Sequence, residues 1–206
     1  LFGGYETYLA DEMTPWLPGW TRHMATCERW IRPSPAKKGL VNKAKRYLEG
    51  LGHSPALGHA RWRCFLSDAM MTEVFSDEFL ARCSENDSHI ENMREAFTSQ
   101  GSVGQSCFAD FKTYLPDNIL TKVDRMSMAV SLEARVPLLD KEMVELAIQV
   151  PSEFKVRNRN LKSILKKAAE QRLPLECIYR GKQGFSMPIK HWLNDSLKEE
   201  MHRLLD

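Results

Sequence analysis

Apolar residues along this chain recur at helical spacing, and alternating strand-like runs are almost absent. The clearest stripe runs over 161–172, where apolar residues fall three or four positions apart and the lysines lie off the stripe. Asn160 is a candidate N-cap for this helix, and Pro174 stops it. The pattern therefore predicts a mainly α-helical fold.

Two further helices have clear boundaries. One begins at Pro116, which suits a first helical turn, and a stripe of apolar side chains follows it up to Val130. The other runs from Asp140, as N-cap, to the breaker Pro151. Weaker patterns predict helices near Tyr5–Glu12, Arg22–Arg32, Ala36–Glu49, Ala56–Phe65, Ser76–Arg82, His89–Phe97, Gly104–Tyr114 and Lys190–Leu205.

Short turn-rich links punctuate the first half of the chain. They lie at 14–19, 32–35 and 51–55, and each contains proline. None is long enough to be an interdomain linker, and no internal repeat is apparent. We therefore expect one compact helical body.

Composition and charge exclude several classes of protein. The 206 residues are 43% hydrophobic and 27% charged, which are ordinary globular values. The 29 Lys and Arg against 27 Asp and Glu leave a net charge of +2, which argues against a dedicated nucleic-acid binder. No apolar run approaches the roughly 20 residues that a membrane-spanning helix needs.

The cysteines argue against a disulfide framework. There are five, an odd number, and no two lie closer than 19 residues. No close pair of Cys or His residues suggests a zinc site, so we predict no metal ligands in this chain. We expect the thiols to be reduced and mostly buried, in a cytoplasmic protein.

Three clusters could carry chemistry. In the first, Lys122-Val123-Asp124-Arg125-Met126 precedes Glu133-Ala134-Arg135, so four or more charges stand among apolar neighbours. Charges in an apolar environment must be paired. The cluster is either a substrate-binding ion network or a structural salt bridge of Glu133 with Arg135 or Arg125.

The second cluster, Lys155–Lys167, holds six cations and no acid in 13 residues. With a helix starting at Asn160, it is a candidate phosphate site. A solvated basic helix face and an RNA-binding surface are the alternatives.

The third cluster is Tyr179-Arg180-Gly181-Lys182-Gln183-Gly184-Phe185-Ser186, in a loop between two predicted helices. Glycines permit mobility, and a lysine can follow a transferring phosphoryl group. The spacing is not that of a Walker A loop. An ordinary flexible loop is the alternative.

Taken in order, the clusters are far more specific. The chain resembles the glutamine-dependent asparagine synthetases, densely over Asp110–Leu193 and at its start, and thinly over residues 10–100. The matching segments are Leu1-Phe2-Gly3-Gly4-Tyr5, Tyr114-Leu115-Pro116, Lys122–Met128, Leu132–Asp140 and Lys182-Gln183-Gly184-Phe185.

The resemblance implies a synthetase domain of the ATP pyrophosphatase type. In that family ATP adenylates the side-chain carboxylate of aspartate, pyrophosphate leaves, and ammonia from a glutaminase domain displaces AMP. The implied partners are thus ATP with Mg²⁺, aspartate and ammonia, with no nucleic acid and no membrane, and a homo-oligomer is left open.

The resemblance also assigns roles to single residues. Lys182 matches a mobile-loop catalytic lysine that contacts the ATP phosphates, and Glu133 matches a catalytic glutamate of β-lactam-forming relatives. Arg125 occupies a cationic position that binds substrate. The remaining matches are Asp124 and Arg135, which orient these groups, and Gln183 and Gly184, which belong to the loop.

Two family segments are missing from the 206 residues: the Ser-Gly-Gly-x-Asp-Ser pyrophosphate loop and the Gly-x-Asp-Glu segment, whose acids would hold magnesium. We therefore expect residues 1–206 to be the C-terminal helical part of a synthetase domain, with the nucleotide-binding sheet and glutaminase domain elsewhere. The piece alone should be inactive, and the surface that the sheet would cover should be apolar.

Other functions stay open at this stage. Related amidotransferases act on other carboxylates, in cell-surface polysaccharide clusters or in lactam formation. A helical interaction module without catalysis, and an RNA-binding domain, are further alternatives.

Overall fold

The computed structural model describes residues 1–31, 39–64, 66, 68–84, 88–95, 97, 102–181 and 188–205. Over these residues the chain is helical and contains no strand, apart from one isolated bridge between Arg157 and Asn160. The predicted mainly-α class is confirmed. Within the same ranges, no helix is both long enough and apolar enough to cross a bilayer.

The chain forms two compact units, Leu1–Ala168 and Ala169–Asp206. The expectation of one compact body was therefore wrong. The close contacts gather within each stretch of sequence, and the last 38 or so residues pack mainly on themselves.

The first unit opens with three helical segments: α1 (Thr7–Met13), η1 (Thr14–Trp16) and η2 (Gly19–Trp30). Pro15 and Pro18 fall at the joints between them, where a missing N–H leaves the helix ladder incomplete. The predicted helix near Arg22–Arg32 is thus present, but as a 3₁₀ helix with exposed tryptophans at both ends, Trp20 and Trp30.

Two glycines bring the next two helices close together. These are α2 (Leu40–Leu51) and α3 (Pro55–Arg63). A Cβ on Gly50 would meet the Trp62 indole, and one on Gly58 would lie 2.7 Å from the Gly50 carbonyl. Trp62 stacks on Tyr47 with ring centroids 5.7 Å apart and donates to the Tyr47 carbonyl. The pair is therefore packed backbone to backbone.

Three short helices follow: α4 (Asp68–Val74), α5 (Asp77–Ser84) and α6 (Ser88–Glu95). The sequence pattern predicts α5 and α6 but misses α4. Phe75 and Phe79 stack at 4.9 Å between centroids, next to α4 and on α5. Met93 of α6 is buried against Ala60 and Ala109.

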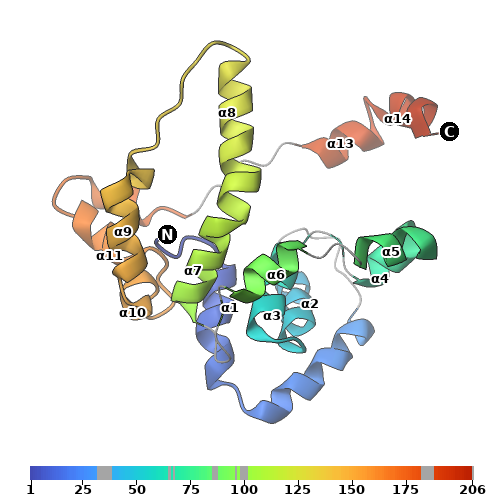
Figure 1. Cartoon of the computed structure of the whole chain (residues 1–206), viewed down its shortest axis with the longest axis horizontal. Helices are drawn as coiled ribbons and strands as arrows, with labels where there is room; N and C mark the ends of the chain where they lie inside the picture. Colours follow the sequence, from blue (N-terminus) through green and yellow to red (C-terminus); the bar gives the residue numbers. More distant parts are fainter. Residues whose placement is uncertain are drawn as a thin grey trace. The chain divides into compact units, whose positions relative to one another are not determined.

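One long rod dominates the first unit (Figure 1). It consists of α7 (Val103–Lys112), the π-helical turn η3 (Leu115–Leu120) and α8 (Thr121–Met128). Ser102 caps α7 by accepting from the Gln105 N–H. Pro116 lies in η3, where its missing N–H favours the wider turn, and the Thr121 hydroxyl donates to its carbonyl at 2.7 Å.

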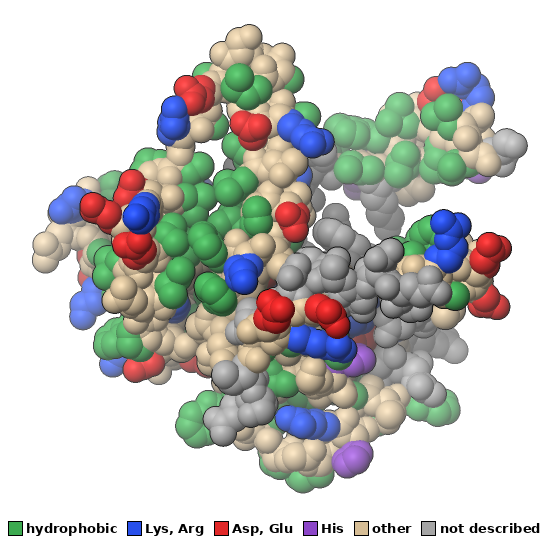
Figure 2. Space-filling view, in the orientation of Figure 1, with side chains coloured by type: hydrophobic (Ala, Val, Ile, Leu, Met, Phe, Trp, Pro, Cys, Tyr) green, Lys and Arg blue, Asp and Glu red, His purple; other side chains and the backbone are tan. Residues whose placement is uncertain are grey.

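Beyond the rod lie η4 (Pro137–Leu139), α9 (Lys141–Gln149) and α10 (Ser152–Lys155). Asp140 caps α9 as predicted, since its carboxylate accepts from the Glu142 N–H at 3.0 Å. Figure 2 shows hydrophobic side chains gathered over α9 and the neighbouring flank of the rod. Val123 and Met126 of α8 and Leu146 of α9 are exposed, so both helices present apolar surface.

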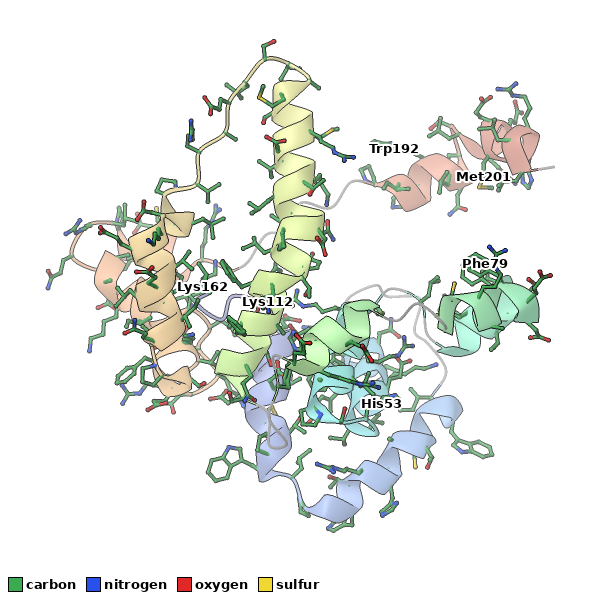
Figure 3. All side chains as sticks on the ribbon, viewed as in Figure 1. His53, Phe79, Lys112, Lys162, Trp192 and Met201 are labelled. Carbon is green, nitrogen blue, oxygen red and sulfur yellow. The ribbon has the colours of Figure 1, made fainter. Side chains whose placement is uncertain are left out.

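The N-cap predicted for the last helix of the first unit was wrong. Asn160 closes a tight hairpin with Arg157 instead, through Asn158 and Arg159 in left-handed conformations. The helix α11 (Ser163–Ala169) therefore begins two residues after the predicted start at 161. Lys162, labelled in Figure 3, leads into it with φ 57° and donates its N–H to the Gly3 carbonyl.

The core of the first unit lies where α1, α7 and the chain after α10 meet. Tyr8, Val103, Cys107 and Val156 form its buried cluster. Gly3 packs here with φ +67°, and a Cβ on it would lie 2.9 Å from a Val156 methyl group, so the approach requires glycine.

The second unit holds α12 (Leu175–Tyr179), α13 (Ile189–Asn194) and α14 (Lys198–Leu205). The continuous helix predicted over 190–205 is broken by a turn, in which the Leu197 N–H donates to the Trp192 carbonyl. Tyr179, the last residue of α12, donates to Glu170 at 2.5 Å within this unit.

The prediction of mostly buried thiols was also wrong. All five cysteines are free, but only Cys107 is buried, while Cys27, Cys64, Cys83 and Cys177 are exposed. Cys107 lies on the buried face of α7, where its thiol packs as a small apolar side chain.

Candidate functional site

The sequence-predicted pairs lie on α8 and on the loop that follows it. Asp124 and Arg125 are exposed on α8. Glu133 and Arg135 lie in the loop, where Arg135 Nη2 is 2.5 Å from Glu133 Oε1 and the two side chains are 83% and 68% exposed. Of the two salt bridges considered for Glu133, the structure contains the one with Arg135.

The α8 pair and the loop pair are not joined to each other. No hydrogen bond or ion pair links Asp124 or Arg125 to Glu133 in the part of the chain that the structure describes. The loop turns back along α8, with the Leu132 N–H donating to the Ser127 carbonyl at 2.9 Å. All four side chains are exposed, so all four are accessible to a ligand.

A shallow groove runs along the rod beside Arg125. Its lining includes Asp117, Thr121 and Lys122, from η3 and α8. Two cations, one carboxylate and a hydroxyl thus lie along one flank of the rod.

The loop predicted to act on ATP phosphates lies outside the described residues. Lys182, Gln183 and Gly184 fall between α12, which ends at Tyr179, and α13, which begins at Ile189. The loop between two helices is where the sequence analysis puts them. Their roles stay predictions.

The basic segment is not one solvated face. Lys155 is only 2% exposed, and burial lowers its pKa. Lys166 donates to the Asn160 side chain at 2.6 Å. One cation is thus buried, another is bonded to Asn160, and the helix begins at Ser163, so the segment is not one uniform basic face. The phosphate-site and RNA-binding interpretations stay predictions.

A charged network that the sequence analysis missed lies in the middle of the first unit. His59 is fully buried on α3, and its Nδ1 lies 2.8 Å from Asp11 of α1 while its Nε2 lies 3.2 Å from Asp110 of α7. Burial alone would lower the pKa of His59, but the two carboxylates outweigh it and raise the pKa to about 9. His59 is therefore a buried imidazolium that bridges two helices.

Asp110 is the hub of this network. Its Oδ2 accepts from the Tyr8 hydroxyl at 2.5 Å and from Arg63 Nη2. Burial opposes ionisation of Asp110, but the hydrogen bond and charge of His59, followed by the charge of Arg63, hold its pKa below the ordinary value. Tyr8 also stacks on His59, with centroids 5.8 Å apart.

The guanidinium of Arg63 packs against two aromatic rings. Its guanidinium carbon lies 4.2 Å from the Tyr5 ring centroid and 4.7 Å from that of Tyr114. It also donates to the Tyr8 hydroxyl at 3.2 Å. Cation–π contacts and the Asp110 pair thus fix one guanidinium to both α1 and the rod.

The sequence carries a signal for this network that went unread. Tyr8 and Asp11 are three residues apart in one predicted helix, and His59 and Arg63 are four apart in another. Polar groups at these spacings share a helix face. Ala56 and Ala60, which share this face of α3 with His59, are also buried.

A magnesium site is not found in the described part of the chain. Nowhere in those residues do three or more His, Cys, Asp or Glu side chains gather in a way that could hold a metal ion. The carboxylates of the network are already engaged by His59, Arg63 and Tyr8. The donors present in the described residues do not fit Mg²⁺.

Comparison with known proteins decides the family. The family model of asparagine synthase matches residues 1–206, the whole chain. The chain belongs to the asparagine synthase family. Its helical fold is accordingly part of a domain of the ATP pyrophosphatase type.

Members of the asparagine synthase family with curated names are similar to this chain. It is 30% identical over 213 aligned residues to asparagine synthetase [glutamine-hydrolyzing] 1 of Bacillus subtilis (strain 168), covering all of this chain and 32% of that protein. It is 42% identical over 84 residues to a putative asparagine synthetase of Mycobacterium bovis, covering 41% of this chain and 13% of that one.

The chain thus spans about a third of the length of the Bacillus relative that it matches throughout. No solved structure matches it significantly.

Proposed function

We propose that residues 1–206 form the helical part of the active site of a glutamine-dependent asparagine synthetase. In the proposed reaction a side-chain carboxylate oxygen of aspartate attacks the α-phosphorus of ATP, and pyrophosphate leaves. Ammonia then attacks the acyl-adenylate, AMP leaves, and a proton is lost as the amide forms. The match of the whole chain to the asparagine synthase family is the observation that carries this proposal.

Each predicted residue has a role in this scheme. Lys182 contacts the ATP phosphates and offsets charge as pyrophosphate departs, with Gln183 and Gly184 shaping its loop. Glu133 holds substrate or takes the proton released by ammonia, and Arg135 orients it through the 2.5 Å ion pair. Arg125, next to Asp124 on the groove flank of the rod, binds an anionic group.

We further propose that the nucleotide-binding sheet, the magnesium ligands and the source of ammonia belong to parts of the synthetase outside residues 1–206. Two observations support this: the chain spans 32% of its Bacillus relative, and large apolar side chains are exposed along α8 and α9. That apolar face is the surface on which the rest of the domain would pack. A cytoplasmic location fits a biosynthetic enzyme with free cysteines.

The decisive experiment compares two lysines in the complete synthetase. Lys182→Ala is expected to abolish aspartate-dependent pyrophosphate exchange and asparagine formation, while hydrolysis of glutamine continues. Lys141→Ala, on α9 with its side chain 87% exposed, is the matched control and should leave both activities unchanged. Synthesis by Lys182→Ala within a few-fold of the unsubstituted enzyme would refute the catalytic assignment.

Substrate choice and self-sufficiency need separate measurements. Other carboxylates offered in place of aspartate should give no amide, and a product formed only from one of them would point to a different amidotransferase. Purified 1–206 alone should not catalyse ATP–pyrophosphate exchange. Robust exchange would overturn the proposed division of the active site.

A further inference from the structure

In the part of the chain that the structure describes, the rod of the first unit is anchored in the core through α7. Asp110, on the inner face of α7, is 5% exposed and held by three side chains from α1 and α3. No residue of α8 is buried. The proposed substrate-binding pair Asp124 and Arg125 therefore sits on the exposed end of a lever whose other end is fixed in the core.

Arg63 contacts the rod at two points that lie one helical turn apart. Its Nη2 donates to Asp110 on α7, and its guanidinium carbon lies 4.7 Å from the ring centroid of Tyr114, which immediately precedes η3. The Tyr5 ring also contacts the same guanidinium, with its centroid 4.2 Å from the guanidinium carbon. Two contacts separated along one helix restrain its roll as well as its position.

The junction after Tyr114 transmits that restraint to α8. The Asp117 N–H bonds to the Thr113 carbonyl, and the Thr121 hydroxyl bonds to the Pro116 carbonyl, so hydrogen bonds span the junction although Thr113 itself has non-helical dihedral angles. A rotation of α7 at Arg63 is therefore carried into α8. A displacement of about 1 Å in a reacting group costs on the order of 100-fold in rate.

We propose that Arg63 is a positioning residue for the synthetase reaction: clamped by Asp110, Tyr5 and Tyr114, it sets the orientation of α8 and so the placement of Asp124 and Arg125. The inference rests on the proposed function. Arg63 itself lies on α3, outside the groove lined by Arg125, and acts through the rod.

The test uses Arg63→Lys in the complete synthetase. Lysine keeps the charge for Asp110 but loses the planar fork and the flat guanidinium that contacts both rings. We expect kcat for aspartate-dependent pyrophosphate exchange to fall on the order of 100-fold, with KM for ATP changed less than about threefold. Arg61→Lys is the matched control, since Arg61 lies on the same helix with its side chain 10% exposed and faces Glu49 of α2. That control should stay within about twofold.

Hydrogen exchange supplies a measurement independent of activity. In Arg63→Lys the amides of 113–128 should exchange at least about tenfold faster, while those of α2 are unchanged. If Arg63→Lys does not fold, Tyr5→Leu, which removes one ring of the clamp, should give the same pattern with a loss of about tenfold in kcat.

The outcomes separate the two claims. Loss of kcat together with faster exchange in 113–128 supports the positioning role. Normal kcat, or a loss of kcat with unaltered exchange in the rod, overturns it. If the unsubstituted enzyme forms no asparagine, the proposed function fails, and the exchange data alone decide whether Arg63 orders α8.

Discussion

Asp110 and His59 face each other inside the first unit, with 3.2 Å between Asp110 Oδ1 and His59 Nε2. The other nitrogen of the same imidazole lies 2.8 Å from Asp11. Since both ring nitrogens face carboxylates, the charged imidazolium is the form that donates to both at once. A single protonation event thus ties α1, α3 and the rod together.

The stability of the protein should fall as the pH rises through 9. The pKa of His59 is raised from 6.5 to about 9, so the folded state binds this proton more tightly than the unfolded state does. The resulting stabilisation, about 3 kcal/mol, is complete below the unfolded pKa and is lost as the pH passes the folded one. Urea unfolding at about pH 6 and about pH 9.5 measures it.

His59→Gln should flatten this pH dependence, because glutamine carries no proton that titrates in the range. His53→Gln provides the control, since His53 is exposed. A pH profile of unfolding that is the same in His59→Gln and the unsubstituted protein would show that His59 is not the titrating group.

Arg63→Leu should destabilise the first unit by about 3–5 kcal/mol, because it leaves the Asp110 carboxylate short of its cation inside the core. Arg135→Leu removes an arginine from an ion pair that is also short but 83% exposed, and should change the free energy of unfolding by less than about 1 kcal/mol. Chemical denaturation compares the two. Equal effects would show that burial of the network adds nothing.

Gly50→Ala should destabilise α2 despite alanine's higher helix propensity. The new Cβ would overlap Trp62 Nε1, and such overpacking costs about 1–3 kcal/mol. Gly19→Ala, where a Cβ meets nothing within 4 Å, should be neutral or stabilising. Thermal unfolding of both variants checks the contrast, and a stabilised Gly50→Ala would mean that the two helices are not packed closely.

Alkylation should distinguish one cysteine from four. Cys27, Cys64, Cys83 and Cys177 are exposed, whereas Cys107 is buried and burial raises its pKa. With N-ethylmaleimide under native conditions, mass spectrometry should find Cys107 modified only at the rate of unfolding. Rapid modification of Cys107 would contradict the packing of α7 against α1.

Helices with a local start signal could be predicted from the sequence. Asp140 caps α9 as its residue type indicates. Pro116, expected at the start of a helix, lies instead in the π-helical turn that precedes α8. Asn160 failed for a tertiary reason, since the hairpin that it closes with Arg157 uses left-handed residues that no cap preference reveals. The helix α4 was missed because its seven residues are too few to show a repeating helical pattern of apolar positions.

The site was predictable only where a motif names it. The charges around Glu133 and Arg125 stand out in the sequence, and the structure places them on α8 and its loop. The buried network could not be assembled in advance, because Asp11, His59 and Asp110 come from three helices whose pairing depends on packing. Lys155 shows the same limit, since a basic run says nothing about which lysine is buried.

The π-helical turn at 115–120 makes the two halves of the rod face different directions. A residue inserted into an α-helix turns everything beyond it by about 100°, because 3.6 residues complete a turn. Because of the wide turn, the side of α8 that lines the groove is rotated about the helix axis relative to the side of α7 that faces the core. A single-residue deletion there would keep every residue of the synthetase motif in the sequence. It would rotate the side chains of α8 by about 100° about the helix axis.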